Sequence, residues 1–329
     1  MRRLLDAIGL ARQARESGDR IIAHRYRVIE SLGTCGAGER LIAEDEASEQ
    51  QVLLLVLGPA FAGREAAVRR YVEQPRDYGD PRIVLPHAWG VDGDRPFTVT
   101  RWIDGEPLTQ LIGRGLPPWS ETFELLEDLA DILSVPHQQR LAHGSLEPGR
   151  IFLSHGTAWI LDFGLAAALG RSPASPAYVA PEILAGRSPN HLSDLYSLAV
   201  IIWELVSGAP PFTGSLGEIV DGHRNRPVPE LVRRSNAPPE LEVFLDIALA
   251  KLPDERFANT LELLETLRGI QASSSGVWSL SALSAADSTP GEPVLPPTTE
   301  LGAMLRSFSV IELRATRDLI DQLLAARGG

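Results

Sequence analysis

Residues 143–164 read HGSLEPGRIFLSHGTAWILDFG, the stretch around which the rest of the chain is organised. It opens with a polar loop at His143 that carries an acidic and a basic side chain, Glu147 and Arg150. Two apolar runs follow, and runs of this length predict a pair of strands. The triplet Asp162-Phe163-Gly164 closes the stretch. Ionisable side chains are therefore expected at both ends of a short strand pair.

The stretch resembles part of a bacterial, eukaryotic-like (Hanks-type) Ser/Thr protein kinase, namely the segment that joins the catalytic loop to the metal-binding loop. In that family the loop reads close to HRDLKPEN and leads, through a strand pair, to DFG. The positions that stay in register are His143, Leu146, Pro148, Ile151, Leu153, Asp162, Phe163 and Gly164. The resemblance implies three replacements in the chemistry. Ser145 stands for the Asp that accepts the substrate's proton, Glu147 for the neighbouring Lys, and Arg150 for the Asn that holds a second magnesium.

The family's phosphate-binding lysine lies on a strand that reads VAIK. The apolar run QVLLLVL at 51–57 predicts a buried strand, and it places Leu55 at the lysine position. The chain has one lysine in all, Lys251, so no neighbouring strand supplies a substitute. The partner glutamate on the next helix is expected at Glu65 or Glu73, and either one then lacks its counter-ion. These differences predict a degenerate family member, a pseudokinase that is not an enzyme.

The segment TCGAGER at 34–40 resembles the family's glycine-rich loop, GxGxxGxV. Cys35 stands where the backbone comes closest to phosphate, and it is expected to be an inert, exposed thiol. Arg40 replaces the valine that covers the adenine; alternatively, it turns toward the phosphates and compensates for the missing lysine. The residues interpreted as vestigial nucleotide-binding positions are Gly33, Gly36, Gly38, Arg40 and Asp162. ATP binding is therefore expected to be weak or absent, and no magnesium is expected.

Arg150 brings a positive charge to a place where the family binds a cation. Because the family's Asn and the Asp of DFG share a magnesium, their side chains end within reach of each other. We therefore predict that Arg150 pairs with Asp162 and takes the metal's place, a contact that arginine makes well. The alternative is a loop arginine that points to solvent.

The large-lobe motifs are those that support the fold rather than the reaction. The segments that resemble the family's SDVYSLG and ELLTGRPPF are SDLYSL at 193–198, WEL at 203–205 and GAPPF at 208–212. By this resemblance, Asp194 holds the backbone of the catalytic loop, and Glu182 pairs with Arg256. The residues expected to have structural roles are His143, Phe163, Gly164, Glu182, Asp194 and Arg256.

The activation segment, between DFG and the motif Ala180-Pro181-Glu182, is short and carries Ser172 and Ser175 beside prolines. In the family, an arginine next to the loop histidine reads a phosphate on this segment, but here Gly144 stands in its place. Phosphorylated serines would therefore find no receptor at that position, and both are expected to be ordinary loop residues.

Composition limits the class of partner. The 329 residues include 44% hydrophobic side chains and carry a net charge of −12, with a pI near 5.1. This acidity argues against nucleic acid or an anionic membrane surface as the main partner. One cysteine excludes an internal disulfide and fits a reducing compartment. No apolar run approaches the roughly 20 residues that a membrane span needs, and the amino terminus has no secretory pattern. A cytoplasmic protein is expected.

The expected architecture is α+β: a two-lobed, protein-kinase-like fold with a helical extension at the carboxyl end. Its divisions are an N-terminal helix at 1–20, a small lobe at 21–104, a large lobe at 105–270, a Ser/Pro-rich linker at 271–299 and an amphipathic helical tail at 300–329. The apolar face of the tail comprises Leu313, Ile320, Leu323 and Leu324. Such a face does not stay exposed to water, so it is expected either to dock on its own domain or to bind another protein.

The function expected from these observations is that of a regulatory scaffold that binds protein partners through its lobes and tail. One alternative is a nucleotide-binding transferase that uses Asp162 in an altered pose. Another is a sensor that binds nucleotide without turnover.

Overall fold

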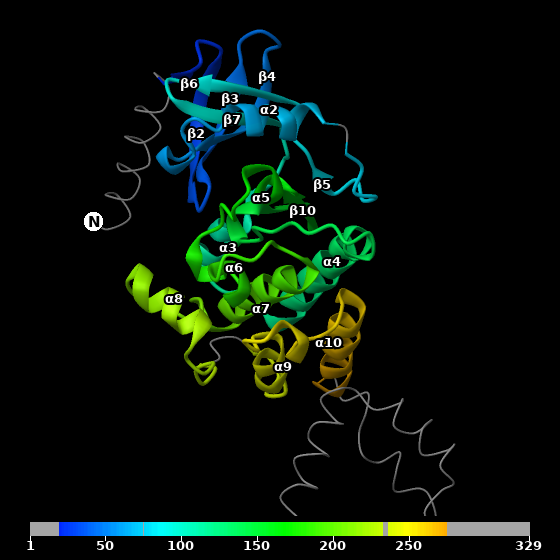
Figure 1. The fold of residues 1–329 in the computed structure, drawn as a ribbon. Helices are drawn as coiled ribbons and strands as arrows, with labels where there is room; N and C mark the ends of the chain where they lie inside the picture. Colours follow the sequence, from blue (N-terminus) through cyan, green and yellow to red (C-terminus); the bar gives the residue numbers. More distant parts are fainter. Residues whose placement is uncertain (1–19, 75, 233–235, 275–329) are drawn as a thin grey trace, which may run out of the picture.

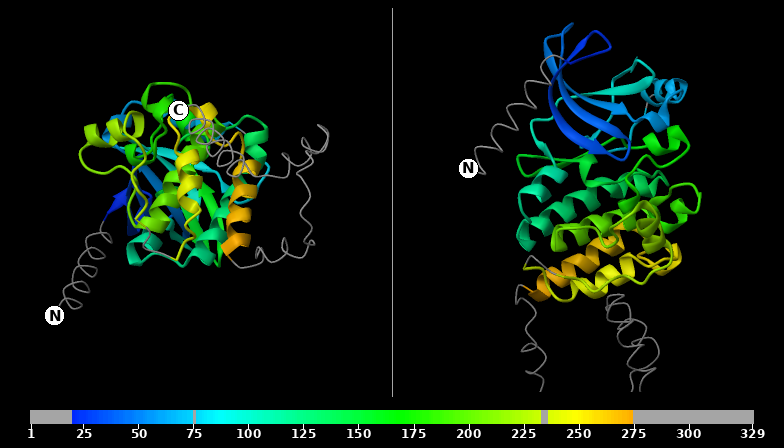
Figure 2. Two further views of the ribbon diagram at one scale, coloured as in Figure 1. Left: turned by 90° about the horizontal axis from the view of Figure 1, so that it is seen from below. Right: turned by 90° about the vertical axis from the view of Figure 1, so that its left-hand side faces the viewer.

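The computed structural model describes residues 20–74, 76–232 and 236–274, which form two lobes (Figure 1). The small lobe, blue to cyan, is a sheet with a helix beside it, and the large lobe, green to orange, is mainly helical (Figure 2). This is the two-lobed α+β architecture that the sequence predicts. The amino-terminal helix, the carboxyl-terminal tail and nearly all of the linker predicted above lie outside the described residues.

The small lobe is a six-stranded antiparallel sheet in the order β1-β2-β3-β4-β7-β6. Its strands are β1 (Ile21–Ile22), β2 (Tyr26–Cys35), β3 (Gly38–Asp45), β4 (Gln50–Leu57), β6 (Ala88–Asp92) and β7 (Arg95–Arg101). A single turn, η1 (Pro59–Phe61), leads from β4 into helix α2 (Glu65–Glu73). The helix lies beside the sheet at the end that faces the large lobe (Figure 1).

Strand β4 is apolar because both of its faces are covered. Successive side chains of a strand point to opposite faces. Val52, Leu54 and Val56 pack on the outer layer of the small lobe with Tyr26 and Phe97. The intervening leucines point the other way, toward α2 and the large lobe. The uninterrupted apolar run at 51–57 therefore forms a buried strand, as the sequence predicts, and both faces of this strand are covered.

The large lobe combines helices with a small four-stranded sheet in the order β5-β10-β9-β8. The strands are β5 (Ile83–Val84), β8 (Glu106–Pro107), β9 (Ile151–Ser154) and β10 (Thr157–Leu161). The helices are α3 (Leu108–Arg114), α4 (Trp119–Gln138), α5 (Leu165–Leu169), α6 (Pro181–Leu184), α7 (His191–Ser207), α8 (Leu216–Arg224), α9 (Leu241–Ala248) and α10 (Thr260–Ser274). Single turns occur at η2 (Pro148–Arg150), η3 (Pro176–Tyr178) and η4 (Pro253–Glu255). Because α10 continues to Ser274, the predicted linker boundary at 271 lies a few residues too early.

Helix α7 is the centre of the large lobe, and nearly all of its side chains are buried. Asn190 caps its first turn: the side-chain oxygen accepts from the backbone N–H of Ser193 at 3.1 Å, and the Ser193 hydroxyl oxygen accepts from the Asn190 N–H at 3.0 Å. Gly208, with φ 86°, ends the helix in the left-handed conformation. The cap fixes the first turn of α7 and with it Asp194, whose carboxylate points into the site described below.

A buried apolar cluster bridges the two lobes. Ile42 and Leu53 come from the small-lobe sheet, and Phe152 and Leu161 from the strand pair of the large lobe. All four are less than a tenth exposed. The lobes are thus packed together on a continuous apolar surface, and the site lies beside it. Among the residues placed by the structure, no helix is both long enough and apolar enough to span a membrane.

Candidate functional site

The loop that begins at His143 is held by helix α7. The two oxygens of Asp194 accept hydrogen bonds from the backbone N–H groups of His143 and Gly144, at 2.7 and 2.8 Å. The same carboxylate lies 3.0 Å from Nε2 of His137 on α4. Asp194 therefore holds the loop backbone, as the sequence predicts.

The His143 side chain is buried and locked in place. Its Nδ1 accepts from the backbone N–H of Ser145 at 3.2 Å, so Nε2 carries the proton and donates to the Leu161 carbonyl at 2.9 Å. Burial lowers the pKa of His143 to about 4, so the imidazole is neutral at pH 7. Phe163 packs edge-on against this ring, with a centroid distance of 5.3 Å, and at a tilt of 45° against Tyr78, with a centroid distance of 4.3 Å. These contacts hold the DFG segment against the loop.

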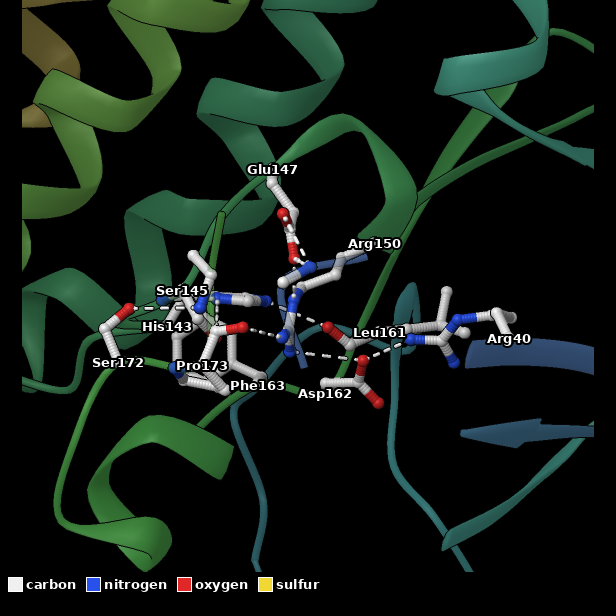
Figure 3. Close-up of polar contacts among 12 residues, drawn as sticks. Arg40, His143, Ser145, Glu147, Arg150, Leu161, Asp162, Phe163, Ser172 and Pro173 are labelled. Carbon is white, nitrogen blue, oxygen red and sulfur yellow. Dashed lines mark hydrogen bonds and ion pairs between the residues drawn. The ribbon is translucent and has the colours of Figure 1, made fainter. Parts of the chain in front are cut away.

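Asp162 lies between two arginines (Figure 3). Its Oδ2 accepts from Nη1 of Arg150 at 3.2 Å and also contacts Nη2 of Arg40. The structure thus contains the Arg150–Asp162 pair that the sequence predicts. Asp162 has φ 62°, a left-handed conformation that aspartate tolerates better than most residues. The approach of Arg40 to this carboxylate was not predicted, although its entry into the cleft was the alternative considered for that residue.

Glu147 connects three segments of the chain. Its carboxylate accepts from the backbone N–H of Gly36 in the glycine-rich loop, at 3.2 and 3.3 Å, and from the N–H of Ser175 in the activation segment, at 3.0 Å. It also accepts from Nε of Arg150 at 3.1 Å. The sequence analysis did not predict this bridging role, because it interpreted Glu147 only as the replacement of a lysine. The signal available was the paired change at 147 and 150, which are three residues apart and of opposite charge.

Arg40, Glu147, Arg150 and Asp162 form a buried cluster that we call the arginine latch. Each of the four is at most 3% exposed. Two guanidiniums face two carboxylates, so the formal charges cancel, which buried charges require. Burial alone would raise the pKa of Asp162, but the adjacent Arg40 and Arg150 hold it below its ordinary value. The Asp162 carboxylate is therefore ionised at neutral pH.

The glycine-rich loop lies directly on the activation segment. A Cβ atom added to Gly36 would lie 2.0 Å from the backbone nitrogen of Ser175. Cys35, half-buried rather than exposed as predicted, packs on Gly149 of the catalytic loop. Gly38 also permits a close approach, since a Cβ there would lie 2.1 Å from the Val56 carbonyl oxygen, whereas Gly33 faces open space. The loop is thus closed onto the large lobe.

A hollow beneath the closed loop is very small. The hollow between Arg40, Cys35 and Gly149 has a volume of about 10 Å³, roughly the room that one water molecule needs. Sites for drug-sized ligands occupy about 300 to 1,000 Å³. This hollow is far below that range. Magnesium prefers oxygen ligands, and here the Asp162 carboxylate is already paired with Arg40 and Arg150.

Leu55, at the family's lysine position, belongs to an apolar cluster. It is fully buried with Val68 and Tyr71 of α2 and Leu165 of α5. The hydroxyl of Tyr71 donates to the Phe163 carbonyl at 3.1 Å. The residue of α2 that faces the DFG segment is therefore Tyr71.

The candidates on α2 for the family's glutamate, Glu65 and Glu73, lie away from the DFG segment and lack the lysine as counter-ion, as the sequence predicts. Glu73 is exposed and contacts Arg69 and Trp89 at the surface, and Glu65 opens the first turn of the helix. The helix is held by apolar packing and one tyrosine hydroxyl, and no ion pair to β4 is available.

The remaining structural residues lie where the sequence predicts. Glu182 and Arg256 form a buried bidentate pair, with nitrogen–oxygen distances of 2.7 and 2.9 Å. Gly164 has φ 80°, and a Cβ there would lie 2.4 Å from the Tyr78 hydroxyl, so a glycine is required. The tail residues proposed to bind a partner, Leu313, Ile320, Leu323 and Leu324, lie outside the described residues.

The family profile described as "Protein kinase domain" matches residues 64–266. The chain is 30% identical over 266 residues to serine/threonine-protein kinase PknB of Mycolicibacterium smegmatis. The aligned segment covers 74% of this chain and 42% of that protein. It is 28% identical over 255 residues to PknD of Mycobacterium tuberculosis, covering 72% and 38%. It is 27% identical over 270 residues to PknA of Mycobacterium tuberculosis, covering 76% and 62%. The chain therefore spans less than two thirds of the length of these relatives.

The names of these relatives contradict the prediction that the chain is not an enzyme. Each is a serine/threonine-protein kinase, and the family match extends through most of the large lobe. The prediction depended on three positions, Leu55, Ser145 and Arg150, whereas the comparison covers the domain as a whole and points to a kinase.

Proposed function

Because the chain belongs to the protein kinase family, we propose that it is a regulatory member of that family, which binds protein partners while its own side chains occupy the nucleotide cleft. The observation that supports this proposal is the arginine latch. Arg40 and Arg150 contact the same carboxylate oxygen, that of Asp162. The latch fills the place where the family's chemistry needs a metal ion, and Glu147 closes the glycine-rich loop over it.

A closed cleft suits a protein whose folded surface is recognised by a protein partner. The large lobe keeps the contacts that stabilise the fold, namely the Asp194 bonds and the Glu182–Arg256 pair. Since the loop, the activation segment and α2 are fixed to one another, the chain presents a defined surface without a bound nucleotide. A preorganised surface loses less entropy when a partner binds.

A thermal-shift titration of the full chain with ATP, with and without magnesium, tests the proposal. A ligand that binds only the folded state at 100 times its Kd stabilises that state by about 2.7 kcal/mol, which raises the melting temperature. The regulatory function predicts no response at millimolar ATP. A shift independent of magnesium would instead indicate a nucleotide sensor, and a shift that requires magnesium would indicate a transferase.

Phosphoryl transfer is the second candidate, and it is favoured by the names of the relatives. One local observation also favours a nucleotide ligand. Nε and Nη1 of Arg40 and Oδ1 of Asp162 are buried without a hydrogen-bond partner in the described structure, and such groups gain from a ligand that satisfies them. An opened latch would offer Arg40 to phosphate oxygens. Transfer of radiolabelled phosphate from ATP to a protein substrate, abolished by Asp162→Ala, would support this candidate over the first.

The tail predicted at 300–329 follows the kinase-like lobes in the sequence. It is the second element of the chain that we propose to bind protein partners. Replacing Ile320 and Leu324 by Asp in the full chain removes half of the proposed apolar face without changing the kinase-like domain. We expect the variant to lose binding to protein partners that the unmodified chain captures. Equal capture by both chains would assign partner binding to the lobes.

A further inference from the structure

A large hollow lies beside the DFG segment, outside the latch. It has a volume of about 820 Å³ and is lined by four segments, at 76–78, 140–144, 164–172 and 183–189. These are the stretch after α2, the loop after α4, the start of the activation segment and the loop after α6. The volume is within the range of ligand-binding sites, about 300 to 1,000 Å³.

The lining of this hollow is strongly basic. One arginine comes from each of the four segments: Arg76, Arg140, Arg171 and Arg187. Across the described ranges, none of these four guanidiniums forms an ion pair. Other partly exposed arginines do, namely Arg20, Arg25, Arg82, Arg226 and Arg268. Asp77 supplies the one carboxylate among the lining residues, and it accepts from the backbone N–H of Gly79 at 2.8 Å. Four positive charges thus face one negative charge in a chain whose net charge is −12.

Two of the arginines are positioned by aromatic rings. The guanidinium carbon of Arg76 lies 5.1 Å from the centre of the Tyr71 ring, and that of Arg171 lies 4.9 Å from the Phe61 ring. Stacking of this kind orients a guanidinium without neutralising it. The neighbouring His143 adds no charge, because burial keeps its imidazole neutral. The positive charge of the hollow is therefore available to a ligand.

Gly144, which also lines the hollow, lets Ala166 and Pro189 pack closely against the catalytic loop. It has φ 75°, and an added Cβ would lie 2.9 Å from side-chain atoms of both Ala166 and Pro189. The sequence led us to expect no receptor for an anion at this position, because the arginine of the family is absent. The structure shows instead that Arg140 of the same segment, together with one arginine from each of three other segments, lines the hollow beside Gly144.

We propose that this hollow, the arginine pocket, binds an anionic segment of a protein partner that carries phosphate or clustered carboxylates. The inference deepens the partner-binding function proposed above and rests on it. Guanidiniums bind both groups through paired hydrogen bonds. Because the rest of the chain is acidic, an acidic segment is drawn to the pocket and repelled elsewhere.

Fluorescence anisotropy with labelled peptides tests this proposal on the full chain. The probes are octaglutamate, an octapeptide with two phosphoserines among glycines, and octaglutamine as the uncharged control. In the pocket variant, Arg140→Gln with Arg187→Gln, two exposed lining arginines lose their charge. The control variant, Arg64→Gln with Arg224→Gln, makes the same change of net charge at exposed arginines outside the lining.

We expect at least one anionic peptide to bind the unmodified chain and the control variant alike, and to bind the pocket variant at least tenfold more weakly. The tighter of the two peptides identifies the anionic group. Octaglutamine should not bind, and salt should weaken the anionic peptide. Equal weakening in both variants, or no binding of either anionic peptide, would overturn the proposal. The latch contains none of these four arginines, so such a failure would leave the account of the cleft unchanged.

Discussion

Replacing Arg150 by Met tests the arginine latch most sharply. The Arg150 side chain is fully buried, and it donates to three acceptors: Glu147 at 3.1 Å, Asp162 at 3.2 Å and the Pro173 carbonyl at 3.4 Å. Methionine replaces the unbranched stem of arginine but carries no guanidinium and no charge. The substitution therefore leaves two buried carboxylates facing one guanidinium, that of Arg40.

The expected cost follows from the burial of the partners. Removing one member of a buried ion pair typically destabilises a protein by about 3 to 5 kcal/mol, because the remaining charge is left uncompensated. For a domain of this size, 1 kcal/mol corresponds to roughly 2 to 4 °C in melting temperature. The variant should therefore melt roughly 6 to 20 °C lower. Restoring the charge balance with Glu147→Gln in the same chain should recover at least about 1 kcal/mol, since the two residues are in contact.

Urea unfolding at pH 7 measures the loss of stability, and Arg268→Met is the matched control. Arg268 forms a pair with Glu127 that is shorter than the Arg150 pairs, at 2.7 Å, but its side chain is 55% exposed. Exposed pairs contribute at most about 1 kcal/mol, so this variant should be nearly as stable as the unmodified chain. If Arg150→Met costs no more than Arg268→Met, the latch is not a stabilising cluster and the reasoning fails.

Three further outcomes are expected. Glu182→Gln removes one charge of the buried pair with Arg256 and should cost about 3 kcal/mol in urea unfolding; a cost below about 1 kcal/mol would contradict the buried-pair account. Burial lowers the pKa of His143 and of His223 to about 4, whereas the unfolded value is about 6.5, so the unfolded state binds more protons between these values. Stability should accordingly fall as the pH falls from 7 to 5, by about 2 kcal/mol for each histidine, and equal urea midpoints at the two pH values would contradict this. Gly36→Ala should speed hydrogen exchange at the Ser175 amide, because the added Cβ cannot share that space; unchanged exchange would show that the loop does not rest on the activation segment.

Much of the fold could be predicted from residues that act locally. The apolar run at 51–57 indicated a buried strand because its leucines are covered on both faces, and the large-lobe motifs placed Asp194 and Glu182 correctly. The Arg150–Asp162 pair was also predictable, since a positive charge had replaced a residue that contacts a cation in the family. In each case the sequence pattern specifies either the periodicity of buried side chains or a contact between two residues that is known from the family's fold.

The unpredicted parts depend on contacts between distant segments. Gly36 and Glu147 are 111 residues apart in the chain, and no periodicity indicates that one accepts a hydrogen bond from the other. Tyr71 was overlooked because an ionic partner was sought on α2, whereas Leu55 favours an apolar one. The arginine pocket combines four segments that each carry one ordinary surface arginine, so the cluster exists only once the chain has folded.

Isothermal titration calorimetry with ATP and magnesium tests the central claim most directly, by comparing the unmodified chain with Arg40→Ala combined with Arg150→Asn. The double variant removes both guanidiniums from Asp162 and restores the family's amide at position 150. If the latch excludes nucleotide, the unmodified chain should bind ATP with a Kd above about 1 mM, and the double variant at least tenfold more tightly, a change of about 1.4 kcal/mol. Tight binding to the unmodified chain, or equal binding to both, would contradict the account.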